Sequence, residues 1–244
     1  MVAGFKAGDM SMPIDTKKWR MRKLLFWKRI WEDLEIGYLD KDLIPVLLLL
    51  NRESSIYTMS SCSGRITVSD STTPWSRKNS TIIFKTHVPV PSSTMSFIYK
   101  IPVYSNLWVN VTGPIIHLST LNIKSAIMIL RIARECGYKH SGIMHVSRSK
   151  GIILELATGV YLTQLVKTKN TVLIDSQGFD EFIKTLNNVL IEGKKRLQKL
   201  YERLSEELPW ELDIEIDKDI PKRIKEDLGT PLDIFERMKK ETLI

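Results

Sequence analysis

The stretch from Ser55 to Ser69, which reads SIYTMSSCSGRITVS, places two short strand-like runs on either side of a small polar turn. Residues 55–60 and 65–69 are rich in Ile, Val, Thr and Tyr, which favour β-strands. The turn itself combines small hydroxyls, a thiol, a glycine and an arginine. Such a turn gathers backbone N–H groups and hydroxyls beside a side chain that can hold a carboxylate or a phosphate. A plain Ser/Gly β-turn is the alternative interpretation.

Further strand-like runs follow this turn along the chain and determine the fold class. Pro, Gly, Asn and Ser separate these runs, as they commonly separate strands. The expected strands cover 80–87, 97–101, 107–111, 115–119, 141–147, 151–157 and 160–167, with 171–174 as a candidate for one more.

Helical periodicity surrounds the β region. Thr16 can cap a helix that runs to about Glu35, with apolar residues recurring at spacings of three and four. Trp19, Trp27 and Trp31 belong to this helix, and their spacing favours a position facing a core over stacking on bases. Three more helices are expected over 40–50, 122–137 and 178–208.

Strands and helices are mixed rather than strictly alternating, which indicates an α+β fold. We expect a single domain with a mixed, largely antiparallel sheet flanked by helices. A G-x-G-x-x-G turn between a strand and a helix is absent from the sequence, so a Rossmann fold with a dinucleotide-type site is not expected. The expected organisation is a flexible arm over 1–15, the domain over 16–208, and an acidic, weakly helical extension over 209–244.

The charge of the chain is unevenly distributed. There are 36 Lys and Arg against 28 Asp and Glu, a net charge of +8. From Glu206 to Ile244 there are 12 acidic and 7 basic residues, a net of −5, so the preceding part carries +13. Cations concentrated in two helices suit the phosphates of a nucleic acid, although solvated helix faces are the alternative. The candidate contacts are Lys17, Lys18, Arg22, Lys23, Lys194, Lys195 and Arg196. The acidic tail would be a separate appendage that covers or competes with this basic face.

Several classes of protein are disfavoured. The apolar stretch at 43–50 is far shorter than the roughly 20 residues of a membrane-spanning helix. No signal peptide is indicated, so a cytoplasmic location and no membrane partner are expected. The two cysteines cannot form a disulfide framework, and no H-x-x-x-H or C-x-x-C pair offers a zinc site, so no metal is expected. Cys62 is either an activated thiolate near Arg65 or a small filler.

The serine-rich turn and its surroundings resemble the tRNA wybutosine (wyosine-derivative) synthesis N4-methyltransferase family. The serine run is Ser60 to Ile66, and Asn51 precedes it at the family's distance. His87 ends the next apolar strand, like the family's histidine. The segment 113–117, Gly-Pro-Ile-Ile-His, is similar to the family's Glu-Pro-Phe-Ile-Leu-His. The segment 137–143, Gly-Tyr-Lys-His-Ser-Gly-Ile, is similar to its Gly-Phe-Arg-Asn-Ser-Gly-Ile. The resemblance covers roughly 20–205 and is to the archaeal stand-alone form.

This resemblance implies an S-adenosylmethionine-dependent methyltransferase. The implied reaction is methylation of N4 of 7-(3-amino-3-carboxypropyl)-4-demethylwyosine at position 37 of tRNA-Phe, with the anticodon arm as partner. The alternative is a non-catalytic RNA-binding module that positions tRNA for a partner enzyme.

The resemblance also assigns expected roles to residues. His117 is the first candidate for orienting or deprotonating N4 and His87 the second, with Ser63 in the same catalytic set. A polar cradle for a carboxylate of the cofactor or of the base, and the lining of the same cavity, are expected from Ser60, Ser61, Ser63, Cys62, Gly64, Arg65, Ser141 and Gly142.

Overall fold

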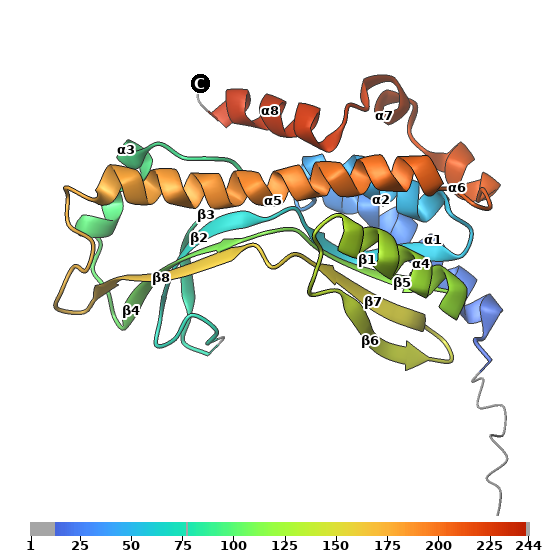
Figure 1. Cartoon of the computed structure of the whole chain (residues 1–244), viewed down its shortest axis with the longest axis horizontal. Coiled ribbons are helices and arrows are strands. Elements are labelled where there is room, and N and C mark those ends of the chain that lie inside the picture. Colours follow the sequence, from blue (N-terminus) through green and yellow to red (C-terminus); the bar gives the residue numbers. More distant parts are fainter. Residues whose placement is uncertain (1–12, 77, 243–244) are drawn as a thin grey trace, which may run out of the picture.

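The computed structural model describes residues 13–76 and 78–242 and shows an α+β fold (Figure 1). The helices are α1 (Thr16–Glu35), α2 (Ile44–Arg52), α3 (Ser92–Met95), α4 (Ile123–Glu135), α5 (Phe179–Glu207), α6 (Ile214–Asp219), α7 (Lys222–Asp227) and α8 (Pro231–Thr242), with 3-10 turns η1 (Lys41–Leu43) and η2 (Ser96–Tyr99). The strands are β1 (Ile56–Cys62), β2 (Arg65–Ser71), β3 (Thr81–Thr86), β4 (Asn106–Thr112), β5 (Ile115–Thr120), β6 (Gly142–Ser147), β7 (Gly151–Ala157) and β8 (Tyr161–Thr168).

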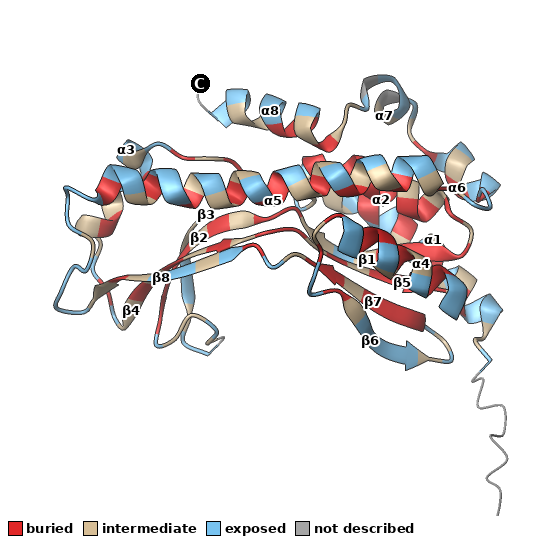
Figure 2. Ribbon diagram, viewed as in Figure 1, coloured by how far each residue is buried: buried red, intermediate tan, exposed pale blue. Residues whose placement is uncertain are grey.

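The strands form two four-stranded sheets, ordered β1-β5-β7-β6 and β3-β2-β4-β8. Neighbouring strands of both sheets are antiparallel throughout the described chain. The expectation of an α+β, largely antiparallel fold flanked by helices is confirmed, with its strands divided between two sheets. In the first sheet β7 is buried and β6 forms an exposed edge (Figure 2).

The chain crosses between the two sheets at three adjacent points. β1 leads into β2, β4 into β5 and β7 into β8, through the links at 63–64, 113–114 and 158–160. A Cβ atom on Gly113 would lie 2.2 Å from Thr158 Oγ1, and one on Gly193 of α5 would lie 3.1 Å from Gly113 Cα. The missing side chains therefore let the links and the long helix approach one another. We call this region the sheet junction.

Helix α5 runs along both sheets on one side (Figure 1). Its C-terminal half joins the first core cluster, with α1, α2, α4 and the first sheet, and its N-terminal half joins the second cluster against β2 and β4. Trp19 and Trp27 of α1 are buried, as their spacing predicts, and Trp31 packs against the first cluster.

Three local predictions are wrong. Residues 97–101 form part of η2 and its end rather than a strand, because a short apolar run is ambiguous between the two and Ile98 is buried from a helical turn. Residues 171–174 contribute an isolated bridge from Val172 to Lys167 instead of a strand. Helix α1 is capped by Asp15, whose side chain accepts from the Lys18 N–H, and not by Thr16.

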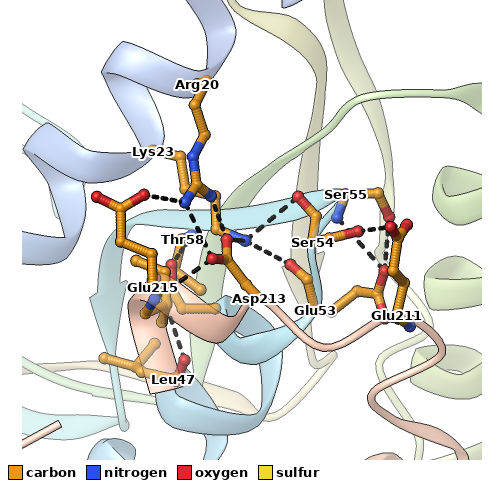
Figure 3. A network of polar contacts seen from close by, with 12 residues as sticks. Arg20, Lys23, Leu47, Glu53, Ser54, Ser55, Thr58, Glu211, Asp213 and Glu215 are labelled. Atoms are coloured by element: carbon orange, nitrogen blue, oxygen red, sulfur yellow. Dashed lines mark hydrogen bonds and ion pairs between the residues drawn. The ribbon is translucent and has the colours of Figure 1, made fainter. Parts of the chain in front are cut away.

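The C-terminal extension is a packed part of the molecule. Lys23 of α1 contacts Asp213 Oδ2 at 2.8 Å, and Arg20 pairs with both Asp213 and Glu215 (Figure 3). Glu53, at the end of α2, accepts hydrogen bonds from the Trp210 and Glu211 N–H groups. Apolar side chains of α6 and the turn after it, Ile216 and Ile220, complete the first core cluster. The predicted weak helix over 231–240 is α8, which packs along α5 on the side away from the sheets (Figure 1).

The predicted N-terminal arm falls mostly outside the described residues. Its described end is held to the body, since the Asp15 N–H donates to the Arg148 carbonyl oxygen at 2.7 Å. Across the described residues, no helix combines the length and the apolar character that a bilayer crossing needs.

Candidate active site

The serine-rich turn lies at the sheet junction, where it links β1 to β2. Gly64 adopts φ +94°, and a Cβ atom there would lie 2.6 Å from the Thr112 carbonyl oxygen of the neighbouring link. Only glycine adopts such a backbone freely at so close an approach. The turn is therefore held as a rigid crossing.

A buried ion pair between Lys194 and Asp42 stabilises the serine-rich turn. Lys194 Nζ of α5 lies 2.7 Å from Asp42 Oδ2 and donates to Ser63 Oγ at 2.6 Å. The Lys194 and Asp42 side chains are at most 1% exposed, and Ser63 is fully buried. Ser63, predicted to act in catalysis, and Lys194, predicted to contact tRNA, thus lie in the interior and bind each other. Both residues instead fix the position of the turn.

Asp40 and His87 form a second polar pair on the turn. Asp40 Oδ2 accepts from the Ser63 N–H at 2.8 Å, and Asp40 Oδ1 lies 3.3 Å from His87 Nε2. His87 Nδ1 lies 3.0 Å from the Gly64 carbonyl oxygen. A carbonyl oxygen can only accept, so Nδ1 carries the proton and neutral His87 has its lone pair on Nε2.

The environment keeps His87 neutral at neutral pH. Burial lowers the pKa of His87 below its ordinary value, and the carboxylate of Asp40 opposes this shift. A proton that arrives at Nε2 would lie next to Asp40 Oδ1, which stabilises the imidazolium. Neutral His87 therefore has an unprotonated Nε2 beside a carboxylate.

Cys62 lies beside this pair but is not an activated thiolate. Burial, and then the charge of Asp40, raise the pKa of the Cys62 thiol, while Arg65 lowers it to a smaller extent. Asp40, Cys62 and His87 each place a potential ligand atom within 4.8 Å of the others. The absence of a metal stays a prediction, to be tested by metal analysis of the purified protein.

The Asp40–His87 pair opens into a cavity of about 330 Å³, which we call the histidine pocket. This volume is at the lower end of the range for small-molecule sites. Its polar and charged lining includes Asp40, Lys41, Lys85, His87 and Glu241.

His117 belongs to a different arrangement, on the first sheet. His117 Nδ1 lies 2.9 Å from Ser60 Oγ, and His117 Nε2 lies 2.9 Å from Glu155 Oε2. Glu155 pairs directly with His117 on one side and with Gly142 on the other. Because a carboxylate only accepts, Nε2 donates to Glu155, and Nδ1 is left to accept from the Ser60 hydroxyl. The predicted first-choice histidine therefore orients a serine of the signature.

A second cavity, of about 230 Å³, lies by these serines, and we call it the serine pocket. Ser60 and Ser61 line it together with Phe26, Tyr38 and Asp33. Among the described residues, Ser61 Oγ is buried without a hydrogen-bond partner, which leaves a polar group for a ligand. Leu39 lines both pockets, so the two cavities share a wall.

Two other predicted residues have different surroundings. Ser141 is buried; its hydroxyl donates to the Tyr138 carbonyl and accepts from the Ala157 N–H, so it stabilises the turn before β6. Arg65 begins β2 opposite Thr112 and is half-buried. The structure thus brings together Cys62, Ser63, Gly64 and His87 in one group and Ser60, His117 and Gly142 in another.

The predicted tRNA contacts divide into exposed and engaged side chains. Lys17, Lys18 and Lys195 are exposed, and of these Lys18 Nζ lies 3.4 Å from Asp15 Oδ2. Lys23 is fully buried, and burial lowers its pKa to about 8 against the opposing effect of Asp213, so it cannot contact RNA directly. Arg22 is half-buried over the ring of Phe26. Arg196 Nε donates to Glu192 at 3.0 Å, and Arg196 Nη1 donates to the Gly137 carbonyl.

Sequence reasoning missed three acidic residues of the site. From the sequence, Asp40 is only the residue that starts a helix. In the structure its carboxylate accepts the Ser63 N–H of the serine-rich turn. Asp42 and Glu155 stand in otherwise apolar segments, DLIPVLLLL and GIILELA. A lone acid in such a segment signals a polar or charged partner, because unpaired charge is rarely buried; the partner is buried Lys194 for Asp42 and half-buried His117 for Glu155.

Comparison with known proteins gives one family. The sequence model of the family described as "Methyltransferase TYW3" matches residues 17–206. A protein of Saccharolobus solfataricus, named tRNA(Phe) 7-((3-amino-3-carboxypropyl)-4-demethylwyosine(37)-N(4))-methyltransferase, is 42% identical over 173 residues, covering 70% of this chain and 82% of its own length. A protein of the same name from Aeropyrum pernix is 32% identical, covering 67% of this chain and 86% of its own. The solved structure of the PH1069 protein from Pyrococcus horikoshii superposes with a TM-score of 0.72 at 25% identity, covering 78% of this chain and 97% of that one.

Proposed function

The chain belongs to the Methyltransferase TYW3 family, and from this premise we propose that it methylates N4 of 7-(3-amino-3-carboxypropyl)-4-demethylwyosine at position 37 of tRNA(Phe). The observation that carries the mechanism is the Asp40–His87 pair, held on the serine-rich turn and facing the histidine pocket. A proton acceptor is what a ring nitrogen needs in order to take a methyl group, because it must lose its hydrogen as the new bond forms.

The residues of the serine pocket suit one end of S-adenosylmethionine, the proposed methyl donor, because a cavity of about 230 Å³ is smaller than a site for a whole molecule of this kind. Tyr38 offers an exposed aromatic ring to a purine, and the Asp33 carboxylate, which lies 3.4 Å from Arg29 Nε, offers acceptors to ribose hydroxyls. Ser61 Oγ is a buried polar atom that lacks a partner in the described part of the chain. When bound, S-adenosylmethionine supplies an activated methyl group on a sulfonium centre. Ser60, oriented by His117 and Glu155, is the second polar group of this pocket.

His87 then has a defined task. As N4 takes the methyl group that S-adenosylmethionine would supply, with the sulfonium sulfur as leaving group, the N4 proton would pass to His87 Nε2. Asp40 Oδ1, 3.3 Å from Nε2, stabilises the resulting imidazolium. The Lys194–Asp42–Ser63 network fixes the serine-rich turn, and the Ser63 N–H of this turn donates to Asp40, which holds the carboxylate beside His87. His117, the first choice from the sequence, acts in this proposal by orienting Ser60.

The anticodon arm is the proposed macromolecular partner, and the domain over 16–208 is the proposed catalytic unit. Lys17 and Lys18, at the exposed start of α1, are the best-placed of the predicted phosphate contacts, with Lys195 on α5. Such contacts position RNA and do not read its sequence. A tRNA substrate is consistent with a cytoplasmic location.

Methyl transfer tests the function directly. Purified protein is incubated with S-adenosylmethionine labelled in the methyl group and with tRNA(Phe) that carries the 4-demethylwyosine precursor with its aminocarboxypropyl chain. Label should enter the modified nucleoside, and it should not enter unmodified tRNA(Phe). Binding of the precursor tRNA without any transfer of label would instead support a non-catalytic tRNA-binding module.

A further inference from the structure

Helix α8 lies outside the 17–206 segment that matches the family, yet it lines the histidine pocket. Met238, Glu241 and Thr242 of α8 share this cavity with Asp40 and His87. The extension of this chain therefore contributes side chains to the cavity into which the proposed proton acceptor opens.

The position of α8 is fixed by contacts to the body. Phe235 is 2% exposed, and its ring centroid lies 5.2 Å from Lys194 Nζ, the ammonium that holds Ser63. The Leu232 N–H donates to Gln198 Oε1 of α5 at 3.1 Å. These contacts place α8 over the buried network of the turn and position its last turn at the pocket.

The charged lining of the pocket has both signs. Lys41 and Lys85 supply cations, and Glu241 of α8 supplies a carboxylate. Lys41 Nζ lies 3.8 Å from Glu241 Oε2, and their side chains are 60% and 67% exposed. An exposed pair at this separation contributes little to stability and can exchange its partner for a ligand.

We propose that the histidine pocket binds an α-amino acid end group, with its ammonium on Glu241 of α8 and its carboxylate on Lys41 and Lys85. This inference rests on the proposed function and deepens it. Two participants in that reaction carry such a group, namely the aminocarboxypropyl chain of the base and the methionine end of the methyl donor. In either case α8 is a specificity element that this chain adds to the family domain.

The test uses the full-length variants Glu241→Gln and Lys85→Gln. Both side chains are exposed and outside the buried network, so the variants should fold with unchanged stability. Glu236→Gln is the matched control, because Glu236 is an exposed acid of the same helix and pairs with Lys239. The measurements are the donor Kd without tRNA, the KM for precursor tRNA, and the KM for tRNA bearing 4-demethylwyosine without the side chain.

If the base chain is bound, both variants raise the KM for precursor tRNA about tenfold, as expected for loss of a charge-assisted hydrogen bond. The donor Kd and the KM for the shortened base are then unchanged. If the donor is bound, its Kd rises about tenfold instead. Constants equal to those of Glu236→Gln in an active enzyme overturn this inference alone. A wild-type protein that transfers no methyl group overturns the proposed function and the inference with it.

Discussion

The two ring nitrogens of His87 have different neighbours. Nδ1 lies by the Gly64 carbonyl oxygen, and Nε2 lies by the Asp40 carboxylate. The carbonyl of Gly64 determines the tautomer, and Asp40 stabilises the protonated form. Lys194 opposes protonation and Asp42 favours it, but burial has the largest effect on the pKa and lowers it. In the proposed reaction His87 is neutral before N4 is methylated and protonated afterwards.

The acid limb of the rate profile should report this pKa. Since His87 must be neutral to accept a proton, kcat/KM should fall only as pH drops through a value below the ordinary 6.5. Asp40 raises the pKa of His87, so Asp40→Asn should move the limb to still lower pH and reduce the plateau. Initial rates between about pH 5 and 8 measure both effects. A limb above 6.5 would contradict the assignment.

Lys194 should be needed for stability rather than for RNA binding. Lys194→Met leaves Asp42 charged and fully buried without its partner, which should lower the free energy of unfolding by about 3–5 kcal/mol. Lys195→Met, at the exposed neighbouring position, should change it by less than about 0.5 kcal/mol. Urea unfolding of both variants provides the comparison, and equal stabilities would argue against the buried pair.

For the contacts at the site, the sequence predicted the residues of the serine turn and His87 but not the acidic residues that bind them. The serine turn and His87 are visible because they form a string and a strand end. Their partners are distant along the chain, since Lys194 and Asp42 are 152 positions apart. Periodicity places Lys194 on a helix but does not show that it points inward, so the sequence suggested an RNA contact for a side chain that the structure buries against Asp42.

At the scale of elements, the strands and long helices follow from local patterns, while the division into two sheets does not. Alternation of apolar residues identifies β2 and β4, whose buried positions form one core. The crossings depend on glycines that approach other segments of backbone, and spacing in one segment cannot reveal this. The error at 97–101 has a similar origin, because a short apolar run specifies burial and not its geometry.

The sheet junction should be sensitive to a single methyl group. Gly64→Ala forces a Cβ atom to within 2.6 Å of the Thr112 carbonyl oxygen at a φ of +94°. We expect a loss of at least about 1–3 kcal/mol of unfolding free energy. Gly142→Ala is the control, since no described atom lies within 4 Å of its added Cβ and no loss is expected. Thermal unfolding in which Gly64→Ala is as stable as wild type would show that the crossing is not tightly packed.

At the scale of the whole molecule, acidic side chains of the C-terminal extension form ion pairs with the body of the protein. The expected separate appendage is instead three helices joined to the body through α1, α2 and α5. Its acids engage Arg20 and Lys23, which belong to the basic stretch of α1. The basic surface left for tRNA is therefore smaller than the total of +13 before Glu206 indicates.

Asp213 should be central to this docking. Its side chain is 4% exposed and pairs with Lys23, which is fully buried, so Asp213→Ala leaves an ammonium without its carboxylate. The expected loss of unfolding free energy is about 3–5 kcal/mol. Glu215→Gln removes a 63% exposed acid that also pairs with Arg20, and should cost less than about 1 kcal/mol. Denaturant unfolding measures both, and a small effect at Asp213 would indicate that the extension is held by its apolar contacts.

The most direct test of the account is single-turnover methyl transfer by His87→Gln at saturating donor and precursor tRNA. Removal of the proton acceptor should lower the rate by about 100-fold or more while both substrates still bind. His145→Gln is the matched control, because His145 is an exposed histidine on β6 and lies outside both pockets. A His87→Gln rate equal to that of His145→Gln would contradict the central claim that the Asp40–His87 pair accepts the N4 proton.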